Sequence, residues 1–257
     1  MTSGLTAFID MEFGHVYGTC RDLLMPVELG MVLYDPASNT PRFAGRKFSY
    51  DIDVELWRNV TDERGATLGV TATVANLARN EYQKPFLRSH RLSARRIRDA
   101  EVVCNEAFAD LRSAMEDLCT GHDIETLAFF AEGMEVKAFS RAGFPLDAFG
   151  RVDLQKAVMR QLRMKDQLSL DKVAKIIDFS AAYTEIASTH FSYKVPRRLR
   201  HFIKPHRALG DAARIFLLSR ELAEAGGVFE SRAHALLEQY NLLRAGRDMT
   251  AAPGAAT

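Results

Sequence analysis

The sequence predicts an α/β fold in which a mixed β-sheet is flanked by helices. Apolar runs joined by turn residues occupy the first fifty positions, and amphipathic helical patterns occupy the chain after residue 95. A short apolar strand pattern lies between the first two of those helices. Strands followed by helices that can cover a sheet are typical of this layered architecture.

The composition is that of a globular chain. Of its 257 residues, 47% are hydrophobic and 26% are charged, with a formal net charge of +1, which suits one large domain or a domain with an appendage. The three cysteines show neither C-x-x-C pairing nor zinc-type spacing, which favours a reducing, cytoplasmic compartment. We find no N-terminal signal and no apolar run near the roughly 20 residues of a membrane span, so no membrane partner is expected.

The N-terminal region predicts three strands. The first is expected over residues 7–13 and the second over residues 27–34. Residues 35–39, Asp-Pro-Ala-Ser-Asn, form a turn sequence, and residues 42–50 alternate well enough for a third strand. Two strands joined by a turn make a hairpin, so this part of the sheet should be antiparallel.

Downstream, apolar spacing near 3.6 residues predicts a series of helices. They span residues 97–118, 134–142, 153–162, 169–177, 208–225 and 230–243, and a strand is expected over residues 126–130. Ser169 is expected to cap its helix, because serine accepts a hydrogen bond from a first-turn amide. Gly121 and the pair Gly226-Gly227 mark helix ends.

These patterns divide the chain into three parts. Residues 1–225 form one domain, which includes a long surface excursion over residues 51–93 with a short helical candidate near residues 72–78. A C-terminal helix follows over residues 226–245. Residues 246–257, rich in alanine and glycine, are expected to be a disordered tail.

The first strand carries two acids, Asp10 and Glu12, at positions i and i+2. On a strand, such residues project to the same side. Two carboxylates on one buried side repel each other and lose hydration unless a cation lies between them, and oxygen ligands suit Mg²⁺ or Mn²⁺. The alternative is that the two acids merely end a strand in solvent.

Two further acids stand at the start of helical apolar stripes. Glu135 precedes Ala138, Phe139 and Ala142, and Asp211 precedes Ile215, Leu218 and Leu222. Each acid should therefore lie on the inward side of its helix near the N-terminus. The alternative for each is an acid favoured there only by the helix dipole.

Two sequence patterns resemble one known family. Residues 8–12, Phe-Ile-Asp-Met-Glu, followed by residues 28–32, Glu-Leu-Gly-Met-Val, are similar to the first motif of the DnaQ-like, RNase T-like (DEDDh) 3′–5′ exonucleases. Residues 206–212, His-Arg-Ala-Leu-Gly-Asp-Ala, are similar to the third motif, and residues 169–174 resemble the helix that usually precedes it. The resemblance covers roughly residues 5 to 225.

The resemblance implies a ribonuclease H-like fold, with a five-stranded mixed sheet flanked by helices and a C-terminal helical extension. It also implies a hydrolase that removes nucleotides from the 3′ end of single-stranded nucleic acid by a two-metal mechanism. Asp10, Glu12, Glu135 and Asp211 would hold two Mg²⁺ or Mn²⁺ ions. His206 would act as general base on the attacking water.

The second motif departs from the family pattern. Family members carry an aspartate shortly after the central strand, and Glu135 stands at that register here. Glutamate keeps the charge but adds one methylene, which moves the carboxylate by about an ångström unless the backbone compensates. Glu132 is less suited to the role because it falls in the turn.

Basic residues gather in two segments without acids, residues 82–98 and residues 186–210. Such segments are either the footprint of a phosphate backbone or solvated loops balanced by acids nearby in space. With the family resemblance, the residues expected to hold the strand are Lys194, Arg197, Arg198 and Arg200. Phe13 and Gly14 stand where the terminal nucleotide packs in similar enzymes, and a plain core role is the alternative for Phe13.

Two other functions fit the same residues. The first is a nuclease-like module with weakened catalysis that binds nucleic-acid ends or a protein partner. Glutamate in place of aspartate at position 135 and the long excursion over residues 51–93 favour this function. The second is a metal phosphohydrolase acting on free nucleotides, against which the basic segments argue. The choice of RNA or DNA and the presence of a homodimer are left open.

Overall fold

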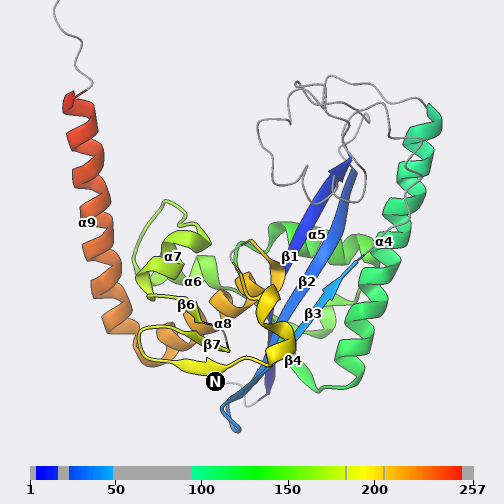
Figure 1. Cartoon of the computed structure of the whole chain (residues 1–257), viewed down its shortest axis with the longest axis horizontal. Coiled ribbons are helices and arrows are strands. Elements are labelled where there is room, and N and C mark those ends of the chain that lie inside the picture. The colour runs from blue at the N-terminus through cyan, green and yellow to red at the C-terminus, as the bar shows by residue number, and fades with distance from the viewer. Residues whose placement is uncertain (1–3, 17–22, 49–93, 183, 205, 251–257) are drawn as a thin grey trace, which may run out of the picture.

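A five-stranded mixed sheet forms the centre of the protein (Figure 1). The structure is a computed structural model, and it describes residues 4–16, 23–48, 94–182, 184–204 and 206–250. The strands of the sheet are β1 (Leu5–Val16), β2 (Leu23–Asp35), β3 (Thr40–Lys47), β4 (Ile124–Phe129) and β5 (Gly150–Asp153). They lie in the order β3-β2-β1-β4-β5, with the first three antiparallel and β1, β4 and β5 parallel. The predicted α/β class with a mixed five-stranded sheet is confirmed.

The turn between β2 and β3 forms where the sequence predicts it. The Asp35 side chain accepts a hydrogen bond from the amide of Ala37 at 2.8 Å, and the amide of Asn39 donates to the Asp35 carbonyl at 3.0 Å. Asn39 adopts φ 47°, a left-handed conformation that asparagine tolerates. The turn fixes the register of the hairpin, in which Gly30 lies opposite Gly45 and, on its other side, opposite Asp10.

One face of the sheet packs on two helices, α4 (Ala94–Thr120) and α5 (Gly133–Ala142). Alternate residues of β1 face this layer, namely Ala7, Ile9 and Met11, and all three are buried in its core. The helices meet them with apolar stripes such as Ala107, Leu111 and Ala114. A period of two on the strand and of about 3.6 on the helix therefore produces this layer.

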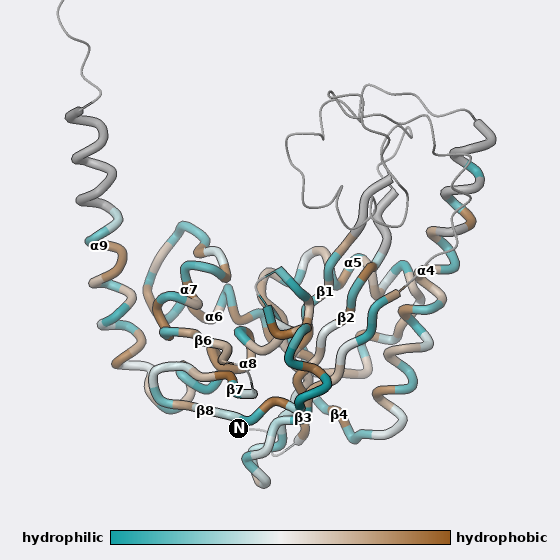
Figure 2. The backbone as a smooth tube through the Cα atoms, viewed as in Figure 1, coloured by the Kyte–Doolittle hydropathy of each residue, from teal (hydrophilic) through white to brown (hydrophobic). Residues whose placement is uncertain are grey.

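The other face packs on α6 (Leu154–Gln161), α7 (Leu170–Ile176) and α8 (Ala208–Glu224). Phe8, the β1 residue between Ala7 and Ile9, points to this side and meets the ring of Phe216 on α8. Ser169 caps α7 by accepting from the amide of Lys172, as predicted, and Asp153 caps α6. Figure 2 shows hydrophobic colour along the inner strands and α8. Both faces are thus covered.

The structure adds short elements that the sequence analysis did not identify. They are β5, the 3₁₀ turns η2 (Leu146–Ala148) and η3 (Arg197–Phe202), and a small antiparallel sheet of β6 (Ser180–Ala182), β7 (Glu185–Ala187) and β8 (Ser192–Lys194). The buried carboxylate of Glu221 on α8 secures this sheet, because it accepts from the Ser188 hydroxyl at 2.7 Å and from the His190 amide at 2.9 Å. Three-residue strands carry too little periodicity to be predicted.

The C-terminal helix is longer than expected. Helix α9 spans Gly226–Thr250, so residues 246–250, expected in the tail, are helical. Its first turns pack on α7 and α8 through Phe229 and Ala233, and it then extends away from the body (Figure 1). Residues 251–257, the excursion over residues 51–93 and its helical candidate lie outside the described residues. In the part of the chain that the structure describes, every helix is too short or too polar to cross a membrane.

The N-terminus of α8 approaches β2 at Gly30 without room for a side chain. A methyl group added to Gly30 would lie 2.1 Å from the carbonyl carbon of Ala208 and 2.2 Å from the amide nitrogen of Leu209. Both are backbone atoms, so no side-chain rotation could relieve the overlap. Glycine at this position therefore sets how close α8 comes to the sheet.

We expect Gly30→Ala to lower the free energy of unfolding by about 3 kcal/mol, because the start of α8 must move away from β2. The measurement is chemical denaturation of the purified variant. Gly45→Ala is the matched control, since Gly45 pairs with Gly30 across the strands but the nearest atom to its added methyl would be a side-chain carbon of Leu209 at 3.4 Å, an ordinary contact. Equal losses in both variants would contradict the close-approach explanation.

Candidate metal centre

Strand β1 presents Asp10 and Glu12 on the same side, as the i, i+2 spacing predicts. They follow Phe8 in alternation, and Phe8 faces α8. Both acids are partly buried. They lie beyond the last described β1–β4 pair, Phe8 with Ala128. Among the described residues, the two carboxylates thus belong to the part of β1 that does not pair with β4.

Helix α8 brings the third carboxylate to this place. Asp211 lies in the first turn of the helix and is 8% exposed. One ligand oxygen from each of Asp10, Glu12 and Asp211 lies within 4.8 Å of the other two. This spacing suits a divalent cation with hard oxygen ligands, which are what Mg²⁺ and Mn²⁺ prefer.

The electrostatic surroundings of these acids favour a bound cation. Burial raises the pKa of Asp10 well above its usual range, and the carboxylates of Asp211, Glu135 and Glu12 raise it further. Burial also raises the pKa of Asp211 to about 6, against the lowering effect of Arg214 and His206. Buried oxygens of Glu135 (Oε2) and Asp211 (Oδ1) have no hydrogen-bond partner within the described structure. Unsatisfied, mutually repelling oxygens are the environment that a bound cation would relieve.

Glu135 comes from the opposite layer of the fold. It heads α5, and the stripe it begins, Ala138, Phe139 and Ala142, is buried as predicted. Burial raises the pKa of Glu135 to about 7, and its charge acts on Asp10. Its oxygens nevertheless lie outside the group formed by Asp10, Glu12 and Asp211. The structure therefore places Glu135 beside the cluster and not within it.

His206 stands next to the cluster in an unusual backbone conformation. Its φ is 57°, the left-handed region, which costs a non-glycine residue free energy. In this conformation its backbone amide donates to the carboxylate of Asp211. The imidazole is largely exposed, and its Nε2 lies 3.9 Å from Oδ2 of Asp171. The residue predicted as general base is thus accessible to solvent and close to a carboxylate that can orient it.

Arg214 is a buried cation at the centre that the sequence patterns did not predict. Its Nη1 donates to Asp171 Oδ1 at 2.8 Å and lies 3.1 Å from Asp211 Oδ1, although not aligned for a hydrogen bond. It lowers the pKa of both Asp10 and Asp211. The i, i+3 spacing from Asp211 could have indicated it, because such residues share a helix face.

A second missed interaction joins the two motifs that carried the family resemblance. Arg207 binds both oxygens of Glu28 at 2.7 Å, from its Nε and from its Nη2. Glu28 is 7% exposed and lies opposite Glu12 in the β1–β2 register. Two facing carboxylates on neighbouring strands repel, so the Arg207 guanidinium compensates the charge of Glu28 beside the centre.

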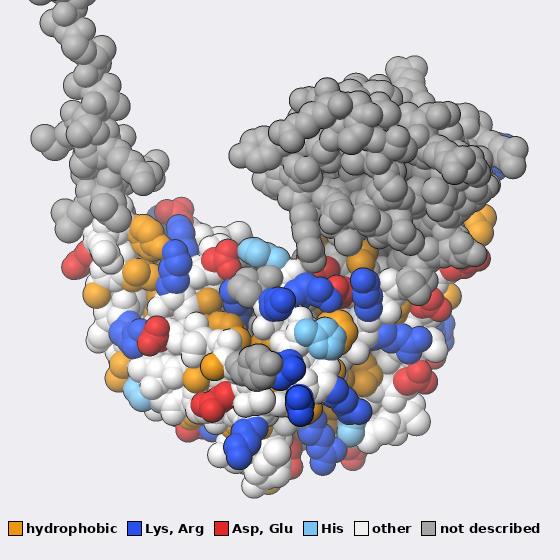
Figure 3. Space-filling view, in the orientation of Figure 1, with side chains coloured by type: hydrophobic (Ala, Val, Ile, Leu, Met, Phe, Trp, Pro, Cys, Tyr) orange, Lys and Arg blue, Asp and Glu red, His pale blue; other side chains and the backbone are white. Residues whose placement is uncertain are grey.

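The predicted nucleic-acid residues lie on β8 and η3. Lys194, Arg197 and Arg198 are exposed and Arg200 is partly buried. Figure 3 shows Lys and Arg side chains gathered over η3 and the neighbouring β3, where Lys47 is also exposed. Phe13 is partly buried against the core on the α4 side, as the core alternative expects, and Gly14 lies one residue beyond it in β1.

No known family model matches the chain, and no curated protein matches it at a significant level.

The buried acids of the centre should make the stability of the protein depend on pH. The pKa values of Asp10, Glu135 and Asp211 are higher in the folded protein than in the unfolded chain, so their protonated forms stabilise the fold below about pH 4. This contribution to the free energy of unfolding is lost as the pH rises through the folded-state pKa values, about 6 for Asp211 and about 7 for Glu135. In EDTA we expect Asp10→Asn to raise the melting temperature at pH 8 by several degrees and to change it little at pH 4. Differential scanning calorimetry measures both values.

The control for this prediction is Asp147→Asn, a substitution of an exposed acid away from the centre. It should leave the melting temperature within about 1 °C of the wild-type value at both pH values. Mn²⁺ should raise the melting temperature of the wild-type protein at pH 8, and raise that of Asp10→Asn less, because the variant lacks one ligand. A variant less stable than the wild-type protein at pH 8 would contradict the assignment.

Proposed function

We propose that the protein is a metal-dependent 3′–5′ exonuclease of the DEDDh type on a ribonuclease H-like fold. The observation that carries the proposal is the meeting of Asp10, Glu12 and Asp211 within 4.8 Å, beside an exposed His206. The strand order β3-β2-β1-β4-β5, with an antiparallel hairpin at one side, is compatible with that fold. The family resemblance of the two motifs supplies the reaction class.

The chain's own residues have distinct parts in this reaction. Asp10, Glu12 and Asp211 would hold the divalent cations, with Glu135 reaching the centre from α5. When bound, such cations neutralise charge on the phosphodiester and lower the pKa of water. His206 would take the proton of the attacking water, since histidine is the side chain most often used as a general base. Asp171, whose Oδ2 lies 3.9 Å from the imidazole Nε2, would help to orient the ring.

The surface beside the centre supports a polyanionic substrate. Lys194, Arg197 and Arg198 are exposed on the segment that leads into His206. Cations in such a row contact phosphates without reading sequence. Single-stranded 3′ ends are the substrate proposed, because exonucleolytic attack needs an unpaired terminal phosphodiester at the acids.

The test is release of mononucleotides from a 3′-labelled single strand, in RNA and DNA forms, with Mg²⁺ or Mn²⁺. We expect Asp10→Ala/Glu12→Ala to abolish release while the fold survives, because removing clustered like charges relieves repulsion. Circular dichroism of the double variant checks the fold. Turnover that persists in the double variant, purified free of contaminating nuclease, would refute the metal assignment.

The separation of Glu135 from the other three acids favours a second candidate. A nuclease-like module that binds 3′ ends with weak turnover would result if Glu135 fails to contribute to the centre. Binding of a labelled strand with no release of nucleotides, even with Mn²⁺, would support this candidate.

Glu135→Asp distinguishes the two candidates. If Glu135 contributes through its longer side chain, the aspartate retracts the carboxylate by about an ångström, and activity should fall on the order of a hundredfold. We expect this fall, because the Glu135 carboxylate is buried, acts on Asp10 and has an oxygen without a hydrogen-bond partner in the described structure. Steady-state kinetics on the same labelled strand measure it. A rise in activity would instead show that the natural residue misplaces the ligand.

A further inference from the structure

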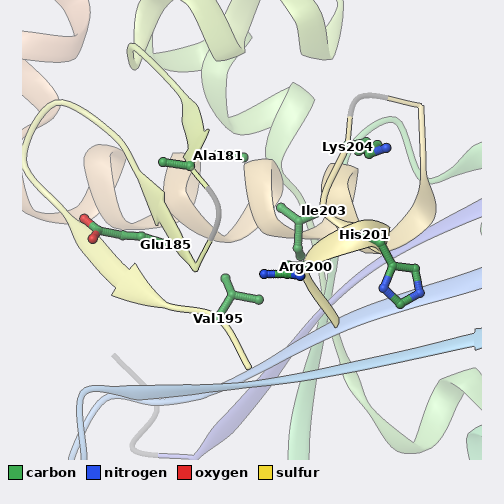
Figure 4. Close-up of a pocket in the computed structure, with 8 residues that line it drawn as sticks. Ala181, Glu185, Val195, Arg200, His201, Ile203 and Lys204 are labelled. Carbon is green, nitrogen blue, oxygen red and sulfur yellow. The ribbon is translucent and has the colours of Figure 1, made fainter. Parts of the chain in front are cut away.

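A cavity of about 330 Å³ lies beside the proposed catalytic centre, between the small sheet and η3. It is lined by Ala181, Ala182, Glu185, Val195, Arg200, His201, Ile203 and Lys204 (Figure 4). Its volume is at the lower end of the roughly 300–1,000 Å³ of small-molecule sites. The cavity is separate from the residues that form the acidic cluster.

The lining combines an apolar floor with a basic rim. Val195 and Ile203 are 6% and 7% exposed and form part of the core on this side. Figure 4 shows Arg200 lying between them, with Lys204 and His201 further along the same side. This pattern suits a flat apolar group that carries a negative charge, because guanidinium groups both stack on rings and bind phosphate.

The single acid of the lining, Glu185, is directed away from the basic residues. The Glu185 carboxylate accepts a hydrogen bond from the Ser192 hydroxyl on β8. In Figure 4 it points away from Arg200. Its aliphatic part therefore contributes to the wall, and the other ionisable residues of the lining are Arg200, His201 and Lys204.

The cavity is rigidly connected to the proposed catalytic centre. The Lys204 carbonyl accepts a hydrogen bond from the amide of Arg207 at 3.2 Å. It also lies against Gly210, where an added methyl group would come within 2.0 Å of that oxygen. Lys204 is two residues from His206 along the chain, a span of at most about 7 Å. Lys204, a residue of the cavity wall, is thus fixed against the start of α8, the helix that carries Asp211.

We propose that this cavity is a subsite for a nucleotide at least two positions upstream of the 3′-terminal one, with its base on the apolar floor and its phosphate at the basic rim. The inference rests on the proposed function and adds a substrate-length requirement to it. We expect the contacts of the base with this floor to change the affinity for a strand about tenfold, which corresponds to about 1.4 kcal/mol.

The experiment fills the cavity with Ala181→Leu/Ala182→Leu. The matched control is Ser180→Leu/Ala187→Leu, which adds bulk to the neighbouring cross-strand pair outside the lining. Binding of a fluorescent pentanucleotide is measured in EDTA, so that the result does not depend on hydrolysis. We expect the dissociation constant to rise about tenfold in the filled variant and to stay within twofold of the wild-type value in the control.

Kinetics with Mg²⁺ then compare a pentanucleotide with a dinucleotide. In the filled variant, kcat/KM for the pentanucleotide should fall about tenfold more than that for the dinucleotide, which is too short to reach the cavity. The subsite proposal would be wrong if kcat/KM fell equally for both lengths, if it did not fall, or if it fell as much in the control. If the wild-type protein binds the strand but releases no nucleotide, the exonuclease proposal fails, and the binding measurement still decides the subsite.

Two further arms complete the test. Ala182→Val adds less bulk and should raise the dissociation constant about threefold, which serves if the double variant does not fold. Calorimetric titration with a nucleoside monophosphate tests whether the cavity binds a free nucleotide in place of a nucleotide within a strand. If the monophosphate binds and the filled variant abolishes that binding while pentanucleotide affinity is unchanged, the cavity takes a free nucleotide, and the strand subsite is wrong.

Discussion

The close approach of α8 to β2 at Gly30 is the constraint on which the rest of the structure depends. Gly30 lies opposite Asp10 in the β1–β2 register, and the backbone of Ala208 lies directly over it. Since Asp211 is in the first turn of the same helix, this one contact sets the spacing between the carboxylates of two distant segments. The Arg207–Glu28 pair secures the helix start to the same strand.

This arrangement brings like charges together at a cost in stability. Asp10, Asp211 and Glu135 all have raised pKa values, chiefly because of burial. Arg214 compensates part of the charge, and the amide of His206, held in a left-handed conformation, stabilises Asp211. Strain and buried charge gathered at one place are typical of functional sites, where stability is given up for binding or catalysis.

The small sheet and η3 extend this centre over the surface. Glu221 on α8 binds the β7–β8 connection through Ser188 and His190. On the same helix, Arg220 packs over the rings of Tyr34 and Phe191 at 4.7 and 4.9 Å. The elements that carry the basic residues and the cavity are thereby attached to the helix that carries Asp211. The residues proposed to contact the substrate and those proposed to form the metal centre consequently share one rigid support.

Much of the central fold follows from local pattern, because its elements are long enough to show their periods. The strand hairpin, the apolar stripe behind Glu135 and the shared side of Asp10 and Glu12 are all read from spacing alone. The proximity of Asp211 to those acids came from the family resemblance, and the structure brings the three together. Strand β5 and the small sheet were missed, since three or four residues show no period.

Tertiary structure alone decided how the charges are compensated. The family resemblance predicts four acids at one centre, but the packing of α5 on the opposite face of the sheet leaves Glu135 beside the other three. The contacts of Arg214 with Asp171 and of Arg207 with Glu28 join residues that are 43 and 179 positions apart. Such pairs depend on which faces meet when layers pack, and local periodicity carries no information about that choice.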